Sequence, residues 1–589
     1  MNPTGKLGIA LSGGGLRAAF FHIGVLARMA ERGLLSQVEV ISAVSGGSII
    51  AALYYIHLKK LLESKADRAI TDQDYVDLVQ RMIRQFWQAT RWNIRLKAFE
   101  DPRANLRLYR RDYSRSDRIA EVYDELLYRP AMGKSEPVEM RELRIFPPGQ
   151  PDFHPRRDNP SRRHKIPVLI INATTLNTGR NWHFTARTMG EPVRYRAGRP
   201  QFDEADSIPI RLRRPFDYFQ IHPCPGHYLH HDPRRCLPSF TVAKAVAASA
   251  AVPGLFPPIT LESLYRDGDD PVCVQLVDGG VHDNQGIDAL LFENCERFVI
   301  SDASGQLDFE HCPDAGALKV LSRAGAVLQD QVRFESLRRL FETRGREQVA
   351  FIHLRKGMEK RELGWIGWNS APYPERRQPA TTLAYGVDPR VQNRLAEIRT
   401  DLDAFHEAEA CALMYDGYQI AATELPAGTP LAGIGWPFSV VAERMRDPDK
   451  DPRFLRQLEI SRHNVGKVLL LDLRLLFWSI GAALLALAWS WPYLTRWLQG
   501  SVPVRTLVVL LLIVALDWAG RRLARVKLRE LEGPTRALKP LLQVPLGGYQ
   551  AIRRFLLHAL LPVLGAVFIK VYLRTFNRLY LCLGRLSHS

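Results

Sequence analysis

Three glycine-rich segments hold the residues of this chain that could do chemistry. Ser45 lies in the run Ala43-Val44-Ser45-Gly46-Gly47, the glycines 13–15 precede it, and Asp278 opens a distant Asp-Gly-Gly run. A serine hydroxyl becomes a nucleophile when a base accepts its proton, and backbone N–H groups can stabilise the oxyanion that then forms on a carbonyl. These residue types predict acyl transfer, with Ser45 as nucleophile, Gly13, Gly14 and Gly15 as oxyanion hole and Asp278 as base.

The sequence around the first two glycine turns predicts α/β order. Short apolar runs at 7–11 and 38–43 are typical of strands, and they alternate with helical patterns at 16–32 and 47–58. Each turn would join a strand to a helix, the position in which a nucleophilic serine is presented by a sharp elbow. Ala43 replaces the first glycine of that elbow and is still small.

The base candidate also follows a predicted strand. Residues 272–277 alternate in polarity, so a strand there would carry Asp278 to the edge of the sheet, and Gly279 and Gly280 allow close approach. His22 and His282 leave a Ser–His–Asp triad open as an alternative.

The first glycine turn also fits a second function. Gly13-x-Gly15-x-x-Ala18 satisfies a relaxed dinucleotide-binding fingerprint. The second predicted strand ends in Ser42-Ala43-Val44-Ser45, however, and lacks the acidic residue that would bind a ribose. The sequence therefore favours the oxyanion hole over cofactor binding.

Taken together, these segments resemble the patatin-like phospholipases of the bacterial type with a C-terminal membrane segment. Residues 172–175 (Asn-Ala-Thr-Thr) and 248–258 (Ala-Ser-Ala-Ala-Val-Pro-Gly-Leu-Phe-Pro-Pro) also resemble internal signatures of that family, so the likeness spans about residues 7–305. It implies a three-layer α/β sandwich with a mostly parallel sheet and a Ser45–Asp278 dyad that works without histidine. It also implies that no metal or organic cofactor is needed. The resemblance assigns supporting roles to Arg17, Gly47, Gly279 and Gly280.

The C-terminal quarter differs from the rest in charge and hydropathy. Residues 453–589 carry 20 Lys and Arg against 5 Asp and Glu, within a whole-chain net charge of +18. These cations bracket apolar runs, a pattern that favours anionic lipid over nucleic acid as partner. The runs at about 475–494 and 505–520 predict a helical membrane hairpin, although helices buried in a soluble domain stay open for both.

The basic residues flanking this hairpin predict its orientation. They are denser before residue 475 and after residue 520 than in the connecting loop, which places the catalytic domain in the cytoplasm, attached to a bacterial inner membrane. A third segment at about 555–580 contains Pro562 and is followed by spaced cations. Its apolar part, Phe555–Ile569, fits an interfacial segment as well as a span.

The domain boundaries follow from these patterns. We expect a catalytic domain over 1–430, made of core motifs 7–305, an insertion 59–165 and a completion 306–430. Spaced Pro and Gly residues then predict a linker at 431–466, and 467–589 is the expected membrane region. The insertion is rich in Arg and aromatic residues, which suits either a lid at a lipid interface or helices packed on the core.

Seven scattered cysteines do not suggest a disulfide framework, which suits a reducing compartment. Cys224, His227, His230 and Cys236 are close enough to raise the question of zinc, although their spacing matches no established metal motif.

The sequence thus predicts a membrane-anchored serine hydrolase of lipid esters. Two alternatives remain: a noncatalytic scaffold that binds lipid, and a thioesterase or protein deacylase that uses the same dyad.

Overall fold

The computed structural model divides the chain into two compact units. One comprises Met1–Val465 with Ile569–Ser589, and the other comprises Gly466–Phe568. The described residues are 5–107, 113–192, 194–196, 199–201, 240–305, 307–367, 372–426, 428, 430–464, 467–471, 481, 485 and 561–586.

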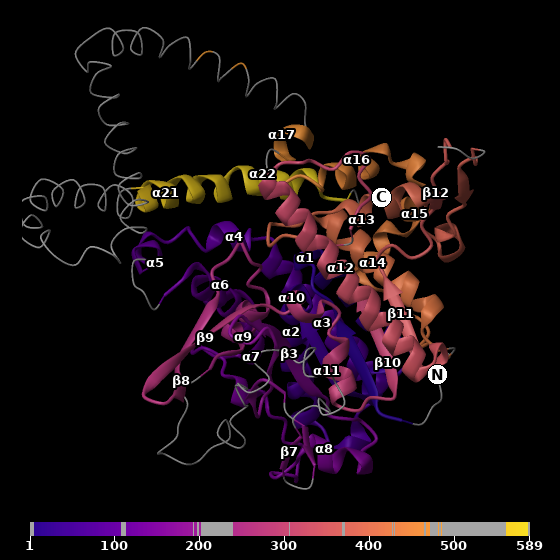
Figure 1. The fold of residues 1–589 in the computed structure, drawn as a ribbon. Coiled ribbons are helices and arrows are strands. Elements are labelled where there is room, and N and C mark those ends of the chain that lie inside the picture. Colours follow the sequence, from indigo (N-terminus) through magenta and orange to yellow (C-terminus); the bar gives the residue numbers. More distant parts are fainter. Residues whose placement is uncertain are drawn as a thin grey trace, which may run out of the picture. The chain divides into compact units, whose positions relative to one another are not determined.

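The first unit is built on a nine-stranded sheet (Figure 1). The strand order is β11-β10-β1-β2-β3-β4-β5, and β9 pairs with both β3 and β8. Their bounds are β1 (Leu7–Leu11), β2 (Val38–Val44), β3 (Val168–Thr175), β4 (Asn181–Phe184), β5 (Met189–Gly190), β8 (Ile259–Asp267), β9 (Asp270–Asp278), β10 (Arg297–Asp302) and β11 (Val349–His353). Two further two-stranded sheets pair β6 (Arg194–Arg196) with β7 (Arg199–Gln201) and β12 (Lys360–Glu362) with β13 (Arg376–Gln378).

Five neighbouring strands of the large sheet, β11, β10, β1, β2 and β3, are parallel. Their carboxyl ends therefore meet at one edge, where ligands of open α/β sheets bind. Strand β9 runs antiparallel to β3 and pairs Asp278 with Ala173, so that its last residue reaches the same edge as the end of β2. The predicted α/β fold with a mostly parallel central sheet is confirmed.

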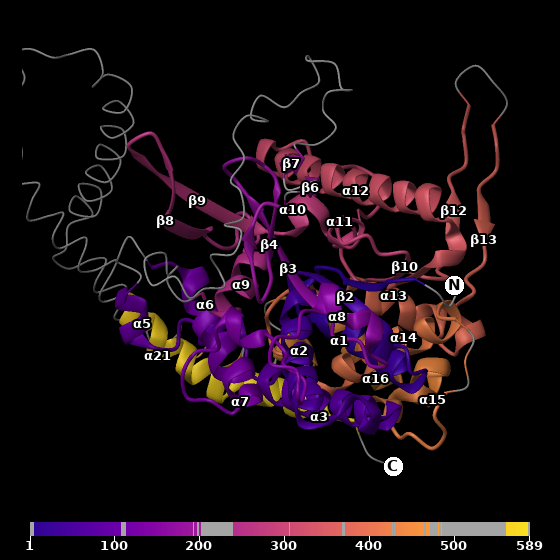
Figure 2. The same cartoon turned by 90° about the horizontal axis from the view of Figure 1, so that it is seen from below.

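Helices cover both faces of this sheet (Figure 2). Alternate residues of the strands point to opposite sides, so Ile9 and Ile41 join the main core with the helices α1, α2, α3 and α14, whereas Ala10 and Val40 join a second core with α11 and α12. The longer helices are α1 (Gly15–Glu31), α2 (Gly46–Ser64), α3 (Asp72–Thr90), α6 (Arg115–Tyr123), α9 (Val242–Ser249), α12 (Ala317–Arg344), α13 (Pro389–Glu397), α14 (Glu407–Glu424) and α16 (Pro452–Ile460). The shorter ones used below are α4 (Ile94–Lys97), α10 (Gly280–Asp283), α11 (Ile287–Phe292) and α15 (Ala442–Arg446).

The segment expected to be a linker, 431–466, instead contributes helices to the first unit. Trp436, Phe438 and Met445 are buried there, and Phe454 and Leu458 of α16 are fully buried in the main core. Apolar side chains at helical spacing override the Pro and Gly residues between them, so the first unit extends to about residue 465.

The C-terminal end of the chain also belongs to the first unit rather than to the predicted membrane region. Helix α22 (Phe576–Leu583) buries Asn577 and Tyr580, and the Leu583 carbonyl accepts a 2.9 Å bond from Gln457 of α16. The chain thus leaves this unit near residue 465 and re-enters it near residue 569.

Little of the second unit lies among the described residues. They form α17 (Lys467–Leu471) and the beginning of α21 (Leu561–Arg574), with single helical residues at 481 and 485. Within the described part of the chain, no helix combines the length and apolar character needed to cross a bilayer. The predicted hairpin at 475–494 and 505–520 falls outside that part, apart from those two single residues.

Candidate active site

Ser45 lies at a sharp elbow between β2 and α2. Its backbone has φ 49° and ψ −116°, and among the described non-glycine residues only Ser45 and Asn294 have a positive φ. A side chain in this region of φ/ψ space is strained by about 1–3 kcal/mol, and such strain is tolerated only where the surrounding fold holds it. The elbow geometry presents the hydroxyl at the carboxyl edge of the sheet, with the residue 6% exposed.

The two glycines after Ser45 allow the elbow to touch the first glycine turn. A Cβ atom on Gly46 would collide with the carbonyl oxygen of Gly15, and one on Gly47 would collide with the carbonyl oxygen of Leu11. Only residues without a side chain fit here, which explains the Ser-Gly-Gly sequence.

Asp278 lies next to Ser45 at the end of β9. Its carboxylate accepts a 2.7 Å hydrogen bond from the Gly280 N–H, and the neighbouring Ser45 side chain lowers the pKa of that carboxylate. The backbone of Asp278 is fixed by its N–H, which donates to the Ala251 carbonyl at 3.0 Å, and by the Thr174 hydroxyl, which donates to its carbonyl at 2.9 Å. Burial raises the pKa of this carboxyl to about 6, because the charged form is removed from water.

The two further segments that resemble family signatures hold this pair in place. Ser249, at the end of α9, accepts a 2.9 Å bond from the Ser45 N–H and shares a 2.8 Å bond with the Ser48 hydroxyl. Asn172 of β3 donates to the Ala43 carbonyl at 2.9 Å. Both ends of the elbow are thereby tied to neighbouring elements, which fixes its strained backbone.

The N–H groups of Gly13, Gly14 and Gly15 are not all free to bind an oxyanion. Gly13 donates its N–H to the Asn284 carbonyl at 3.0 Å, so that group is already engaged. Gly14 and Gly15, at φ 133° and 60°, have no hydrogen-bond acceptor among the described residues for their N–H groups. The structure thus differs from the expectation for Gly13 and leaves Gly14 and Gly15 as the available donors at the start of α1.

A loop around Asp401, distant in sequence, contacts the backbone of this turn. The Leu16 N–H donates to the Asp401 carbonyl at 3.1 Å, and a Cβ on Gly15 would lie 2.9 Å from the Asp401 backbone. Arg17, buried in α1, donates to the carbonyls of Ala396 at 3.1 Å and Ile398 at 2.8 Å. Its guanidinium thus connects α1 to the segment that precedes Asp401.

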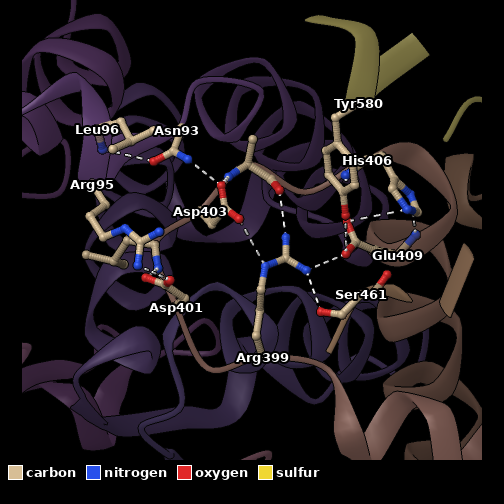
Figure 3. Close-up of polar contacts among 12 residues, drawn as sticks. Asn93, Arg95, Leu96, Arg399, Asp401, Asp403, His406, Glu409, Ser461 and Tyr580 are labelled. Atoms are coloured by element: carbon tan, nitrogen blue, oxygen red, sulfur yellow. Dashed lines mark hydrogen bonds and ion pairs between the residues drawn. The ribbon is translucent and has the colours of Figure 1, made fainter. Parts of the chain in front are cut away.

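The supporting loop is itself held by a buried cluster around Arg399 (Figure 3). Arg399 donates to Glu409 of α14 at 2.5 Å, to the Ser461 carbonyl at 2.8 Å and to the Ala404 carbonyl at 2.7 Å. Tyr580 of α22 donates to the same Glu409 carboxylate at 2.7 Å. The C-terminal helix is therefore connected, through Glu409 and Arg399, to the loop that backs the glycine turn.

The insertion contacts the same loop. Asn93 and Arg95, which flank the start of α4, bond the side chains of Asp403 and Asp401, the latter at 2.6 Å. No sequence pattern indicates this cluster, because an isolated Arg, Glu or Tyr is expected to be exposed until the fold buries it.

Neither candidate histidine joins Ser45 and Asp278. His22 is buried in α1, with one ring nitrogen 2.7 Å from the Ser301 hydroxyl and the other 3.0 Å from the Ser12 carbonyl, and burial lowers its pKa to about 4. His282 is half-buried with a ring nitrogen 3.9 Å from Asp288. The groups bonded to the Asp278 carboxylate include no histidine among the described residues.

The described residues contain no cluster of three or more His, Cys, Asp or Glu side chains arranged to hold a metal ion. Cys224, His227, His230 and Cys236 lie outside those residues, so the zinc question raised by the sequence is not addressed by the structure.

Comparison with known families identifies the part of the chain that contains this site. Residues 9–291 match the family described as patatin-like phospholipase. This segment is similar to the patatin-like phospholipases. It contains the Ser45 elbow, the glycine turn and Asp278. The supporting loop and the Arg399 cluster lie beyond the matched residues.

More distant likenesses accompany the patatin-like match. A human GIVD cytosolic phospholipase A2 in complex with a fluorophosphonate inhibitor is 13% identical, with 71% of this chain and 57% of that chain covered and a TM-score of 0.35. A second structure of the human enzyme is 11% identical over 78% and 63% of the two chains, with a TM-score of 0.33. VipD from Legionella pneumophila is 15% identical over 72% and 67%, with a TM-score of 0.24. This chain therefore spans about three fifths of the human structures, and no curated protein matches it.

Proposed function

We propose that this chain is a membrane-anchored serine hydrolase that cleaves ester bonds of phospholipids or related acyl lipids through a Ser45–Asp278 dyad. The observation that carries the proposal is the strained elbow serine beside a buried carboxylate, within a segment that matches the patatin-like phospholipases. The dyad residues come from the ends of β2 and β9, which places them on rigid elements rather than on a free loop.

In this mechanism the Ser45 hydroxyl attacks the ester carbonyl while Asp278 accepts its proton. The carbonyl oxygen becomes an oxyanion beside Gly14 and Gly15, whose N–H groups are unused in the described structure and lie at the positive end of the α1 dipole. Asp278 then gives the proton to the leaving alcohol, and an acyl group stays on Ser45. Water attacks this acyl-enzyme with Asp278 again as base, releasing the fatty acid and the free serine.

The pKa of Asp278 suits this role. A carboxyl with a pKa of about 6 is ionised at pH 7, as a base must be, yet it holds a proton more strongly than an exposed aspartate does. Gly280 limits the rise in pKa by donating its N–H to the charged form.

The proposal that the protein is attached to a membrane rests on the sequence of the second unit. Its apolar runs and the basic residues around them support anchoring to an anionic leaflet, with the catalytic unit on the cytoplasmic side. Anchoring would keep the site close to lipid substrate and raise its effective concentration.

The test is fatty-acid release from mixed phospholipid vesicles by the full-length protein and its variants. We expect Ser45→Ala and Asp278→Asn to abolish release, and Ser64→Ala, at the far end of the same helix α2, to leave it intact. A fluorophosphonate probe should label the wild type but not Ser45→Ala. Labelling without lipid hydrolysis would point to a thioester or acyl-protein substrate. Absence of both would refute the enzyme and favour a lipid-binding scaffold.

A further inference from the structure

Over the first half of helix α12, the side that faces the body of the unit is polar and the opposite side is apolar. Near its C-terminal end, Leu337 and Leu340 are buried in the core on this face of the sheet and anchor the helix. Extending the same helical face toward the N-terminus, at the spacing of three and four residues, reaches Arg333, Asp330 and Arg323. The face directed at the body thus changes from apolar to polar.

These polar residues make defined contacts with the body of the unit. Arg333 lies 3.2 Å from Asp302, a fully buried carboxylate at the end of β10. Gln329 donates to the Gly280 carbonyl at 2.9 Å, two residues beyond Asp278. Between the helix and the segment that follows β10 lies a cavity of about 310 Å³, lined in part by Asn284, Gln329 and Arg333. The polar side of α12 is therefore already occupied by the protein itself.

The opposite side of the same helix is apolar and exposed. Leu318, Leu321 and Leu328 are 83%, 71% and 68% exposed, and Val332 is exposed with them. Leu321, Leu328 and Val332 recur at intervals of seven and four residues, so they share one side of the helix, opposite Arg323 and Asp330. A surface helix normally buries such a stripe, and contiguous exposed apolar patches mark interaction sites.

More exposed apolar side chains lie on the loops that hold the candidate catalytic pair. Val281 directly follows Gly280, and Val252 and Leu255 follow the serine that binds the Ser45 N–H. In Figure 2, α12 lies beside α10 and α11, on the side of the strands away from α1. The Gln329–Gly280 bond fixes this helix next to the short helix α10, which carries Val281.

We propose that the outward side of α12, from Leu318 to Val332, docks the catalytic unit onto a lipid surface. This inference rests on the proposed function and adds to it the element by which the site meets its substrate. A protein partner seated beside the Asp278 turn would compete with the entry of lipid. A lipid surface is instead both the ligand of the helix and the source of the substrate, and amphipathic helices bind such surfaces through their apolar side.

The first experiment places a photo-crosslinking amino acid at position 328 of the full-length protein in phospholipid vesicles. We expect adducts with lipid at that position. The matched control is Leu383, which is also an exposed leucine (56%) but lies on the turn Thr382–Tyr385, far along the chain from α12, and should give no adduct. Crosslinks between two copies of the chain at residue 328, or no lipid adduct there, would overturn the proposal.

The second experiment separates docking from chemistry. Replacing Leu321 and Leu328 together by Asp should lower hydrolysis of vesicle phospholipid at least about tenfold, since two apolar side chains would no longer be buried in the lipid. Hydrolysis of a soluble short-chain ester should be unchanged, and the Leu383→Asp control should change neither rate. Equal loss on both substrates, or no loss on vesicles, would refute docking by α12. A wild type that hydrolyses neither substrate would instead refute the proposed function.

Discussion

Replacing Asp278 by Asn should abolish activity and at the same time stabilise the fold. Burial raises the pKa of Asp278 from 3.8 to about 6. One pH unit corresponds to about 1.4 kcal/mol, so keeping this carboxylate ionised at pH 8 costs the folded state about 3 kcal/mol. Asn retains an oxygen that can accept the Gly280 N–H bond, and it carries no charge to be desolvated.

The gain in stability should depend on pH in one direction only. Because the folded-state pKa lies above the unfolded value, folded wild type binds more protons than unfolded chain between about pH 4 and 6, and its stability falls as pH rises through that window. The amide introduced by Asp278→Asn does not titrate. The variant should therefore match the wild type near pH 4 and exceed its free energy of unfolding by up to about 3 kcal/mol above pH 7.

Thermal unfolding of the full-length protein in detergent, followed at pH 4.5, 6 and 8, checks this expectation. One kcal/mol moves the melting temperature of a mid-sized domain by about 2–4 °C, and less in a larger one, so a shift of several degrees at pH 8 is measurable. Ser45→Ala removes the hydroxyl beside the same carboxylate and serves as the control for loss of activity without loss of the charge. A variant less stable than wild type at pH 8, or a difference independent of pH, would refute the argument.

Three other expectations follow from the same geometry. With a soluble ester, kcat/KM should rise with pH and level off above an apparent pKa of about 6, because Asp278 must be ionised to act as base. A profile that is flat from pH 5 to 8 would exclude Asp278 as the base. Gly46→Ala should lower kcat at least about 100-fold by forcing the elbow away from the glycine turn, while Gly428→Ala, where an added Cβ meets no atom within 4 Å, should be neutral in the same assay. Tyr580→Phe should lower the free energy of unfolding by about 1.5–3 kcal/mol, because Glu409 loses a buried hydrogen bond to its charge, and an unchanged melting temperature would show that α22 does not hold the cluster.

The local parts of the site could be predicted from the sequence because each follows from a backbone requirement. A serine that lies between a strand pattern and a helix pattern, and is followed by two glycines, has few possible conformations other than the elbow. Asp278 ends an alternating run, so a strand there carries it to the sheet edge. The bond made by the Gly13 N–H could not be predicted in this way. Its N–H is used by the Asn284 carbonyl, and no local pattern reveals a bond between residues that distant.

The packing of residues 431–466 and the Arg399 cluster could not be predicted in the same way. Pro and Gly spacing at 431–466 is typical of a linker, yet burial of Trp436 and Phe454 decides the structure there. The Arg399 cluster joins segments that are distant in sequence, and each of its members alone is an ordinary polar residue. Such contacts come from tertiary packing, which periodicity and propensity do not report.

The return of the chain to the first unit sets an order for its biogenesis. Proteins emerge from the ribosome with the N-terminus first, so Glu409 is made 171 residues before Tyr580, its hydrogen-bond partner. We therefore expect the second unit, residues 466–568, to be synthesised before the helix that completes the Arg399 cluster. Shortening the protein at residue 465 to free it from detergent would remove that helix as well, whereas excising 466–568 and rejoining the ends would keep it.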